Sequence, residues 1–359
     1  MSETLDSLAP DSVIGILGGG QLGRMLALAA ARLGLKTHIY APSLDCPAGE
    51  VASYITAGDY EDTKSLTAFA KQCDAVTYEF ENVPAVTAKL VGGLVPLRPN
   101  AKALDVAQDR LTEKTFLQDT VGVKVAGFYD VANEFDLKRA LKRMGYPGVL
   151  KTRRFGYDGK GQAIIREESD IAAAWDKLGG QPLILEAFIP FVREVSVIAA
   201  RGIDGTCKAY PLTENIHRNH ILHQSLAPAA GDDGKAQEMA MNILTALDYV
   251  GVMGTEFFEL QDGSLIVNEI APRVHNSGHW TIEGSVTSQF QNHIRAICGL
   301  PLGDTRSIAP GMVMRNVVGK GANTAHEVLS DPDTQLHLYG KARALDGRKM
   351  GHTTTLTFD

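Results

Sequence analysis

The sequence predicts a mixed α/β and α+β protein of two or three domains, and three observations support this class. The chain has 359 residues, which is more than one compact core usually holds. It opens with an apolar run, a glycine turn and a periodic helix, the pattern of a βαβ unit. From about Asp109 the pattern changes to short apolar strands joined by polar and glycine-rich loops, which predicts a second domain.

Composition narrows the class of protein. The net charge is −7, with 44% hydrophobic and 21% charged residues, values that are ordinary for a globular protein. No basic run indicates a nucleic-acid partner, no apolar run approaches the roughly 18 residues of a membrane span, and residues 1–12 lack a signal-peptide core. The four cysteines show no paired spacing, so free thiols in a reducing, cytoplasmic compartment are expected; they are Cys46, Cys73, Cys207 and Cys298.

The first unit is predicted to be a strand over 13–17, a glycine turn over 18–24, a helix reaching Gly34 and a strand over 36–40. Glycines at 18, 20 and 23 allow a tight turn, and the helix N-terminus attracts a phosphate. A dinucleotide site also requires an acid at the end of the second strand, but none follows before Asp45. A phosphate or sugar edge of another ligand is favoured, with a purely structural turn as the alternative.

The next strand over 75–80 also ends in polar residues. In open α/β sheets ligands lie beyond the carboxyl ends of strands, so Glu79 and Asn82 are predicted to share a crevice with Gln21 and Leu22. Asn82 could also cap a helix that has Pro84 in its first turn.

The second unit is predicted to begin with helices over 109–122 and 135–144. A strand over 148–151 carries Lys151, and a basic loop with three glycines precedes a strand over 163–165. Flexible glycines with cationic neighbours suit closure over nucleotide phosphates. The order of elements excludes a P-loop, while a plain hairpin loop stays the alternative.

Two further strands, over 183–189 and 193–201, are predicted to hold a nucleoside. The backbone edge of the first could bond a purine ring, and Glu194 on the second could accept bonds from ribose hydroxyls. The histidines at 217, 220 and 223 recur every three residues, so a zinc site is conceivable, although no cysteine lies near them.

The densest polar stretch follows the strand over 265–267. Glu269 at its end and Glu256 on the preceding strand are joined through a short turn at 261–263. Magnesium takes one or two carboxylates plus substrate phosphates, so the two acids are predicted to share such an ion. The alternative is a hairpin with two exposed acids, which the crowding of Asn268, Arg273 and His275 at the same end disfavours.

These motifs together resemble an ATP-grasp family, the 5-(carboxyamino)imidazole ribonucleotide synthetases of purine biosynthesis. The resemblance covers residues 13–352 and rests on the segments 18–24, 79–83, 156–162, 268–273, 275–279 and 347–352. Three departures concern local loops: Val274 replaces an expected proline, Arg315 interrupts an apolar strand, and Leu345-Asp346 replaces arginine and proline.

The resemblance implies an ATP-grasp fold in three parts. These would be a Rossmann-like pre-ATP-grasp domain over 1–110, two ATP-grasp lobes over 111–302, and a small β-rich domain over 303–359 with strands near 311–318 and 353–358. It also implies a homodimer, the commonest closed assembly.

The resemblance implies an ATP-dependent carboxylation of 5-aminoimidazole ribonucleotide by bicarbonate, with Mg2+ or Mn2+. The expected metal ligands are Glu256 and Glu269. The residues expected around ATP are Arg110, Lys151, Gly156, Tyr157, Asp158, Gly159, Lys160, Gly161, Gln162, Glu186, Ala187, Phe188, Ile189, Glu194, His217, Asn268 and Glu269. Those expected at the acceptor site are Gly20, Gln21, Leu22, Glu79, Asn82, Tyr157, Asp158, Arg273, His275, Asn276, Ser277, Arg348 and Lys349.

The implied chemistry assigns catalytic roles. Phosphorylated bicarbonate is carboxyphosphate, which must be kept from water, so the loop over 153–162 is expected to be a lid. Charge neutralisation matters most in phosphoryl transfer, and the amine of the acceptor needs a base, either Asp158 or His275. The expected catalytic residues are Asp158, Lys160, Arg273 and His275. Arg348, Lys349 and backbone donors at Gly20 to Leu22 are expected to hold the ribotide phosphate.

Two alternatives remain. One is a related ATP-grasp ligase that uses formate or glycine. The other is an NAD-dependent oxidoreductase, which the missing acid at the strand end disfavours.

Overall fold

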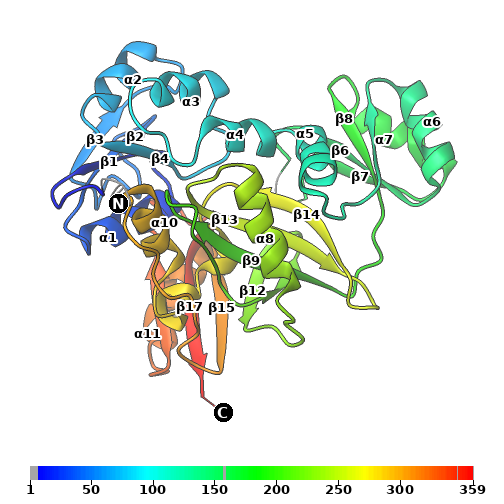
Figure 1. Cartoon of the computed structure of the whole chain (residues 1–359). Coiled ribbons are helices and arrows are strands. Elements are labelled where there is room, and N and C mark those ends of the chain that lie inside the picture. The colour runs from blue at the N-terminus through cyan, green and yellow to red at the C-terminus, as the bar shows by residue number, and fades with distance from the viewer. Residues whose placement is uncertain (1–6, 157–158, 346, 359) are drawn as a thin grey trace.

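The computed structural model describes residues 7–156, 159–345 and 347–358, and Figure 1 shows three sheets in it. The predicted residues Tyr157 and Asp158 lie outside the described residues. Among the described residues, no helix is long and apolar enough to cross a membrane.

The N-terminal part is a parallel four-stranded sheet in the order β3-β2-β1-β4. Its strands are β1 (Val13–Leu17), β2 (Lys36–Ala41), β3 (Tyr54–Ala57) and β4 (Ala75–Tyr78), and its helices are α1 (Gln21–Ala31), α2 (Thr63–Ala70) and α3 (Ala85–Gly92). The predicted βαβ start is therefore confirmed. The suggested cap at Asn82 is wrong, because Pro84 is the N-cap of α3 and no side chain caps it.

A helical bridge leads to the second sheet. It consists of α4 (Ala101–Ala107), α5 (Arg110–Thr115) and a π-helical turn, Phe116–Val121, that ends at left-handed Gly122. Asp109 begins α5 because its carboxylate accepts bonds from the amides of Leu111 and Thr112, the usual N-cap arrangement.

The second sheet is antiparallel, in the order β5-β8-β6-β7, and stands apart at one end of the molecule (Figure 1). Its strands are β5 (Phe128–Val131), β6 (Gly148–Thr152), β7 (Gln162–Ile165) and β8 (Leu183–Ala187). The helices α6 (Glu134–Met144) and α7 (Ile171–Leu178), preceded by a 3-10 turn at Glu168–Asp170, bury their apolar faces on it.

The third sheet has nine antiparallel strands in the order β14-β13-β9-β11-β12-β15-β17-β16, with β10 also paired to β9. The strands are β9 (Arg193–Arg201), β10 (Cys207–Ala209), β11 (Thr213–Arg218), β12 (Ile221–Ala227), β13 (Gly251–Glu259), β14 (Leu265–Ala271), β15 (Gly311–Val318), β16 (Thr334–Leu338) and β17 (Lys349–Thr357). The C-terminal strands thus extend this sheet through β12 and β15 rather than forming a sheet of their own, and they leave β12 no unpaired edge.

Helices cover this sheet and join it to the N-terminal part. They are α8 (Lys235–Ala246), α9 (Thr281–Gly284), α10 (Gln289–Ile297) and α11 (Ala325–Val328), with 3-10 turns at Asn276–Gly278 and Gly319–Thr324. In Figure 1, α8 lies over β9, and α10 lies between the sheet and α1. One apolar core consequently runs from α1 through α10 into the large sheet.

Candidate functional site

The two predicted carboxylates face each other across the strand pair β13–β14. Glu256 is the direct cross-strand partner of Glu269, which confirms that they lie on neighbouring strands. The register then shifts, so that Phe257 opposes Val267 and Asn268 has no cross-strand partner. Directly opposed residues of an antiparallel pair share one face, and such a bulge re-aims nearby side chains.

This strand pair is not a hairpin with exposed acids. The Glu256 and Glu269 side chains are 21% and 39% exposed, and each already has a polar partner: His275 Nε2 lies 3.0 Å from Glu256 Oε1, and Arg110 Nη1 lies 2.9 Å from Glu269 Oε2. The Asn268 Oδ1 atom is buried without a hydrogen-bond partner among the described residues. Carboxylate and amide oxygens are the ligands that a hard divalent cation takes.

A second cluster places three cations around Glu186 on β8. Its Oε2 atom lies 2.9 Å from Lys151 Nζ and 3.7 Å from Lys114 Nζ. Burial alone would raise the pKa of Glu186, but the positive charges of Lys114, Lys151 and Arg110 hold it at about 2. Its other oxygen is buried with no partner in the described part of the chain. The cluster therefore carries a surplus of positive charge beside the two strand carboxylates.

Sequence reasoning missed Lys114, which links the two clusters. The side chain is fully buried, and Nζ donates to the Asn268 carbonyl at 2.5 Å. It stands four residues after Arg110 on α5, the spacing that brings helical side chains to one face. That spacing is the signal that could have identified it.

The glycine loop after β6 lies beside Arg110 and His220. A side chain at Gly156 would come within 3.7 Å of Arg110 Nη2, and one at Gly159 would clash with the ring of His220. Gly159 and Gly161 have φ of 76° and 73°, which favours glycine. The predicted Lys160 lies between these two glycines and Gln162 begins β7, while Tyr157 and Asp158 lie outside the described residues.

The predicted nucleoside contacts need one correction. The strand β8 ends at Ala187 and is paired on both sides, with β5 and with β6, so it has no open backbone edge. A purine contact would therefore fall to Phe188 and Ile189, beyond the strand. Glu194 on β9 is bonded to His217 on β11, with Oε2 to Nδ1 at 2.7 Å. Burial lowers and Glu194 raises the pKa of His217, and the net shift is upward.

The histidines do not form a metal site. His217 binds Glu194, whereas His220 lies against Gly159. Within the described residues, no group of three or more histidine, cysteine or acidic side chains could hold a metal ion. The zinc alternative is therefore dropped.

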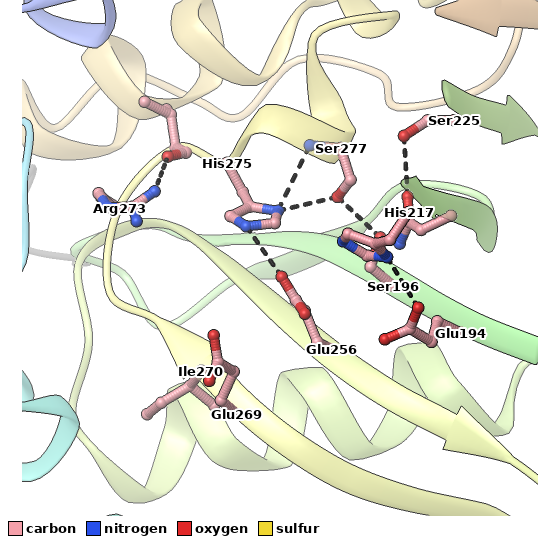
Figure 2. Close-up of polar contacts among 12 residues, drawn as sticks. Glu194, Ser196, His217, Ser225, Glu256, Glu269, Ile270, Arg273, His275 and Ser277 are labelled. Atoms are coloured by element: carbon pink, nitrogen blue, oxygen red, sulfur yellow. Dashed lines mark hydrogen bonds and ion pairs between the residues drawn. The ribbon is translucent and has the colours of Figure 1, made fainter. Parts of the chain in front are cut away.

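The segment after β14 brings its charges to the same place. Figure 2 shows His275 between Glu256 and Ser277, with Arg273 pointing to the other side. The Arg273 guanidinium binds Glu81, an acid that sequence reasoning did not select. Burial would raise the pKa of Glu81, but Arg273 holds it down at about 2. Glu81 is three residues past β4, so the acid belongs to the same crevice as Glu79.

The glycine turn is occupied by a side chain from its own domain. The Glu79 carboxylate accepts bonds from the amides of Gly20 and Gly23, the latter at 2.8 Å. The expectation that the amides at Gly20 to Leu22 hold a phosphate is therefore wrong for the Gly20 donor, because it already has an anionic partner. The same contact opposes a dinucleotide site, since the pyrophosphate would compete with a fixed carboxylate.

One other acceptor-site prediction changes, and two stay predictions. The hydroxyl of Ser277 is fully buried and bonds to His275 rather than lining a pocket. Asn82 is exposed. Both polar side-chain atoms of Asn276 are buried and lack partners among the described residues, as expected of a group that binds a ligand.

A basic group at the start of β17 and in the segment before it completes the arrangement. Arg348 and Lys349 were predicted, and Lys341 joins them, with Nζ donating to the Lys349 carbonyl at 2.6 Å. Burial, then the charges of Arg348 and Lys349, lower the pKa of Lys341 to about 8, while Glu79 opposes the shift. These cations therefore lie on the side of the site that faces Glu79 of the N-terminal part. A separate cavity of about 510 Å³, lined by Gln118, Tyr129 and Met144 among others, contains none of these charged groups.

Three family models match the chain. The ATP-grasp domain matches residues 116–290, the ribonucleotide synthetase preATP-grasp domain matches 12–108, and the phosphoribosylaminoimidazole carboxylase C-terminal domain matches 312–359.

Relatives and solved structures agree with these models. An N5-carboxyaminoimidazole ribonucleotide synthase of Brucella melitensis is 47% identical over 98% of both chains. A longer Dictyostelium discoideum protein, the bifunctional purine synthesis protein purC/E, is 44% identical over 97% of this chain, which spans 37% of it. The N5-carboxyaminoimidazole ribonucleotide synthetase of Thermus thermophilus superposes with a TM-score of 0.90 at 50% identity, over 96% of this chain and 94% of that one. The Aspergillus clavatus synthase in complex with ADP and 5-aminoimidazole ribonucleotide gives 0.90 at 32% identity, over 97% and 94%.

Proposed function

This chain belongs to the N5-carboxyaminoimidazole ribonucleotide synthase family of ATP-grasp enzymes, and from that premise we propose how its residues carry out the family's reaction. The enzyme joins bicarbonate to 5-aminoimidazole ribonucleotide at the expense of ATP, in purine biosynthesis. A ligase that uses formate or glycine is not favoured, because the full-length relatives share the carboxylating name.

The observation that carries the proposal is that two clusters of opposite charge lie next to each other. The carboxylates of Glu256 and Glu269 lie beside the cations Arg110, Lys114 and Lys151, and the Arg110–Glu269 ion pair joins the clusters. A nucleoside triphosphate with its metal ion needs both signs of charge within a few ångströms. No other described part of the chain combines a facing acid pair with three partly or fully buried cations.

The strand carboxylates are proposed to hold the divalent cation. Glu256 and Glu269 face one another, and the buried, unpartnered Asn268 oxygen adds a third hard ligand beside them. When bound, Mg2+ supplies charge neutralisation on the phosphates. Arg110 would then move from Glu269 to a phosphate oxygen, because the metal ion takes its place as the counter-charge.

The phosphates of ATP are proposed to lie against Lys151 and Arg110, below the glycine loop. Burial lowers the pKa of Lys151, although Glu186 opposes this shift, and the ammonium keeps a carboxylate partner at 2.9 Å. Gly156 beside Arg110 and Gly159 beside His220 place the loop between the two lobes. The loop is thus able to cover a carboxyphosphate and exclude water from it.

The ribotide is proposed to lie between the N-terminal part and the C-terminal strands. Lys341, Arg348 and Lys349 supply cations for its phosphate, and Glu79 and Arg273 face the same space. The proton of the attacking amine is assigned to Asp158, because both ring nitrogens of His275 already have partners. A homodimer and a cytoplasmic location remain predictions.

The decisive experiment measures ADP release from the purified chain with 5-aminoimidazole ribonucleotide, with and without bicarbonate. Matched reactions replace bicarbonate with formate or glycine. We expect ADP and the carboxylated ribotide to appear together only when bicarbonate is present. Equal ADP release with formate or glycine in its place would overturn the carboxylase assignment.

A further inference from the structure

A row of buried polar side chains lies behind His275. Ser277 Oγ is 2.9 Å from His275 Nδ1, and Ser196 Oγ on β9 is 2.7 Å from Ser277 Oγ. Asn215 on β11 donates through Nδ2 to Ser196 Oγ at 2.8 Å, and Ser225 on β12 donates to Asn215 Oδ1 at 2.8 Å. Figure 2 shows Ser277, Ser196 and Ser225 on the side of His275 opposite Arg273, and Ser196 is the cross-strand partner of Glu256.

Two of these contacts have a defined donor, Asn215 Nδ2 and Ser225 Oγ, and the contacts between Ser196, Ser277 and His275 fit the same direction of donation. Ser196 accepts from Asn215, so its own hydroxyl proton is available to Ser277. Ser277 then has its proton available for His275 Nδ1, and the Ser277 amide also points at that nitrogen, at 3.4 Å. A ring nitrogen that accepts from a hydroxyl and faces an amide carries a lone pair and no proton.

The other ring nitrogen must then carry the proton. His275 Nε2 lies 3.0 Å from Glu256 Oε1, and a carboxylate can only accept. The backbone of His275 is held as well, because its amide donates to Gln289 Oε1 at 2.9 Å. The imidazole is therefore bonded through both ring nitrogens and held at its main chain.

The row ends inside the protein. Ser277, Ser196 and Ser225 are fully buried, and Asn215 is almost so. A row that stops at a buried serine does not deliver protons to solvent. Its effect is to orient, since satisfied buried networks stiffen the groups they join.

We propose that Ser277, Ser196 and Asn215 are positioning residues that hold His275 as its Nε2–H tautomer, so that His275 orients the Glu256 carboxylate. The proposal deepens the proposed function, on which the metal-binding role of Glu256 rests. Partners of a metal ligand commonly change metal affinity about 10- to 100-fold when removed. Ser196 and Asn215 would act on the metal through Ser277, His275 and Glu256.

The first test reads the tautomer directly. The full chain, labelled with 15N-histidine and free of metal, is studied at neutral pH by long-range 1H–15N correlation, and His275 is assigned by its loss in His275→Gln. We expect a neutral ring with the proton on Nε2. A proton on Nδ1, or on both nitrogens, overturns the proposal without any variant having to fold.

The second test removes a hydroxyl of the row that does not itself contact the His275 ring. In Ser196→Ala we expect a mixed His275 tautomer and an approximately 10-fold higher magnesium concentration for half-maximal ADP release. The control is Ser285→Ala, which removes a buried hydroxyl that has no partner among the described residues. A Ser196→Ala spectrum and magnesium requirement equal to those of the control overturn the proposal. Loss of bicarbonate-dependent ADP release in the unchanged chain would instead refute the carboxylase function.

Discussion

The sequence predicts an ion-binding site both at the glycine turn before α1 and at the strand pair β13–β14. Only the strand pair presents charged groups that are accessible to a ligand. At the turn, Glu79 is 8% exposed and already accepts from the amides of Gly20 and Gly23. On the strands, the partly exposed Glu256 and Glu269 are held by the side chains of His275 and Arg110. A glycine motif shows where a backbone can bind an anion, and the fold decides whether the protein itself supplies that anion.

The two regions also differ in their charge environment. Burial raises the pKa of Glu79, although the amide bonds oppose this shift. Burial would raise the pKa of Glu256 too, but the hydrogen bond from His275, together with the charge of Arg273, lowers it below its ordinary value. The strand pair therefore keeps a full negative charge for a metal ion, whereas the turn keeps a buried carboxyl as a structural partner.

The largest effect is expected at the strand pair. Glu269→Gln keeps the shape of the side chain but removes the charge, so turnover should fall roughly 100-fold or more, as when a charge-stabilising group is lost from an active site. Steady-state ADP release as a function of magnesium concentration measures this. Asp262→Asn, in the turn between the same strands, is the matched control and should be close to normal. Near-normal turnover with unchanged magnesium dependence would remove Glu269 from the metal site.

The second prediction asks which region holds the phosphates. Lys151→Met removes one buried cation, and a bond to a charged group contributes about 1.5 to 3 kcal/mol, so ATP should bind roughly 10- to 100-fold more weakly. Calorimetric titration with ATP tests this, with Lys138→Met on α6 as the control. An unchanged affinity for ATP would show that Lys151 does not bind the phosphates. The glycine turn would then be a candidate phosphate site.

The third prediction concerns the turn. Glu79→Gln replaces one accepting oxygen with an amide donor, so one of the two glycine amides loses its partner, and the free energy of unfolding should fall by about 1 to 2 kcal/mol. Denaturant unfolding measures the loss, and ATP affinity should remain within about twofold of normal. The control is Glu50→Gln, whose side chain is exposed. A weakened ATP affinity with unchanged stability would argue that the turn is a nucleotide site after all.

The fourth prediction concerns the contact that joins the two regions. His293 accepts from the Val252 amide of β13 at 3.1 Å and bonds Thr77 of β4 at 2.8 Å. Burial lowers the pKa of His293 from 6.5 to about 3. Below pH 6.5 the His293 side chain of the unfolded chain binds a proton, whereas in the folded chain it stays neutral. The contribution of neutral His293 to stability is therefore full above pH 6.5 and is lost as the pH falls toward 3.

Replacing His293 should make the stability of the protein depend less on pH. Below pH 6.5, the free energy of unfolding of His293→Gln should fall less steeply with decreasing pH than that of the parent chain. The difference in slope should be up to about 1.4 kcal/mol per pH unit. Denaturant unfolding at several pH values down to about 4.5 tests this before most carboxylates titrate. The exposed His326→Gln is the control. A slope equal to that of the parent chain would show that His293 is protonated in the fold.

Much of the fold followed from local pattern. The βαβ start, the helix begun by Asp109 and the facing of Glu256 and Glu269 all depend on residues close in the chain. Apolar periodicity, a capping side chain and a short turn are enough to specify them. The same holds for the glycine loop after Lys151, whose positive φ values at Gly159 and Gly161 match the residue type.

The remaining features were decided by packing between distant segments. The sequence alone determined which residues could carry charge and where strands would end, because these depend on side-chain chemistry and near neighbours. Only the tertiary structure decided that Glu79 fills the glycine turn 56 residues from Gly23, that Lys114 reaches the Asn268 carbonyl across 154 residues, and that Ser196 stands behind Ser277. The physical reason is that a buried polar group must find a partner wherever the fold brings one, and sequence distance places no limit on which residue that is.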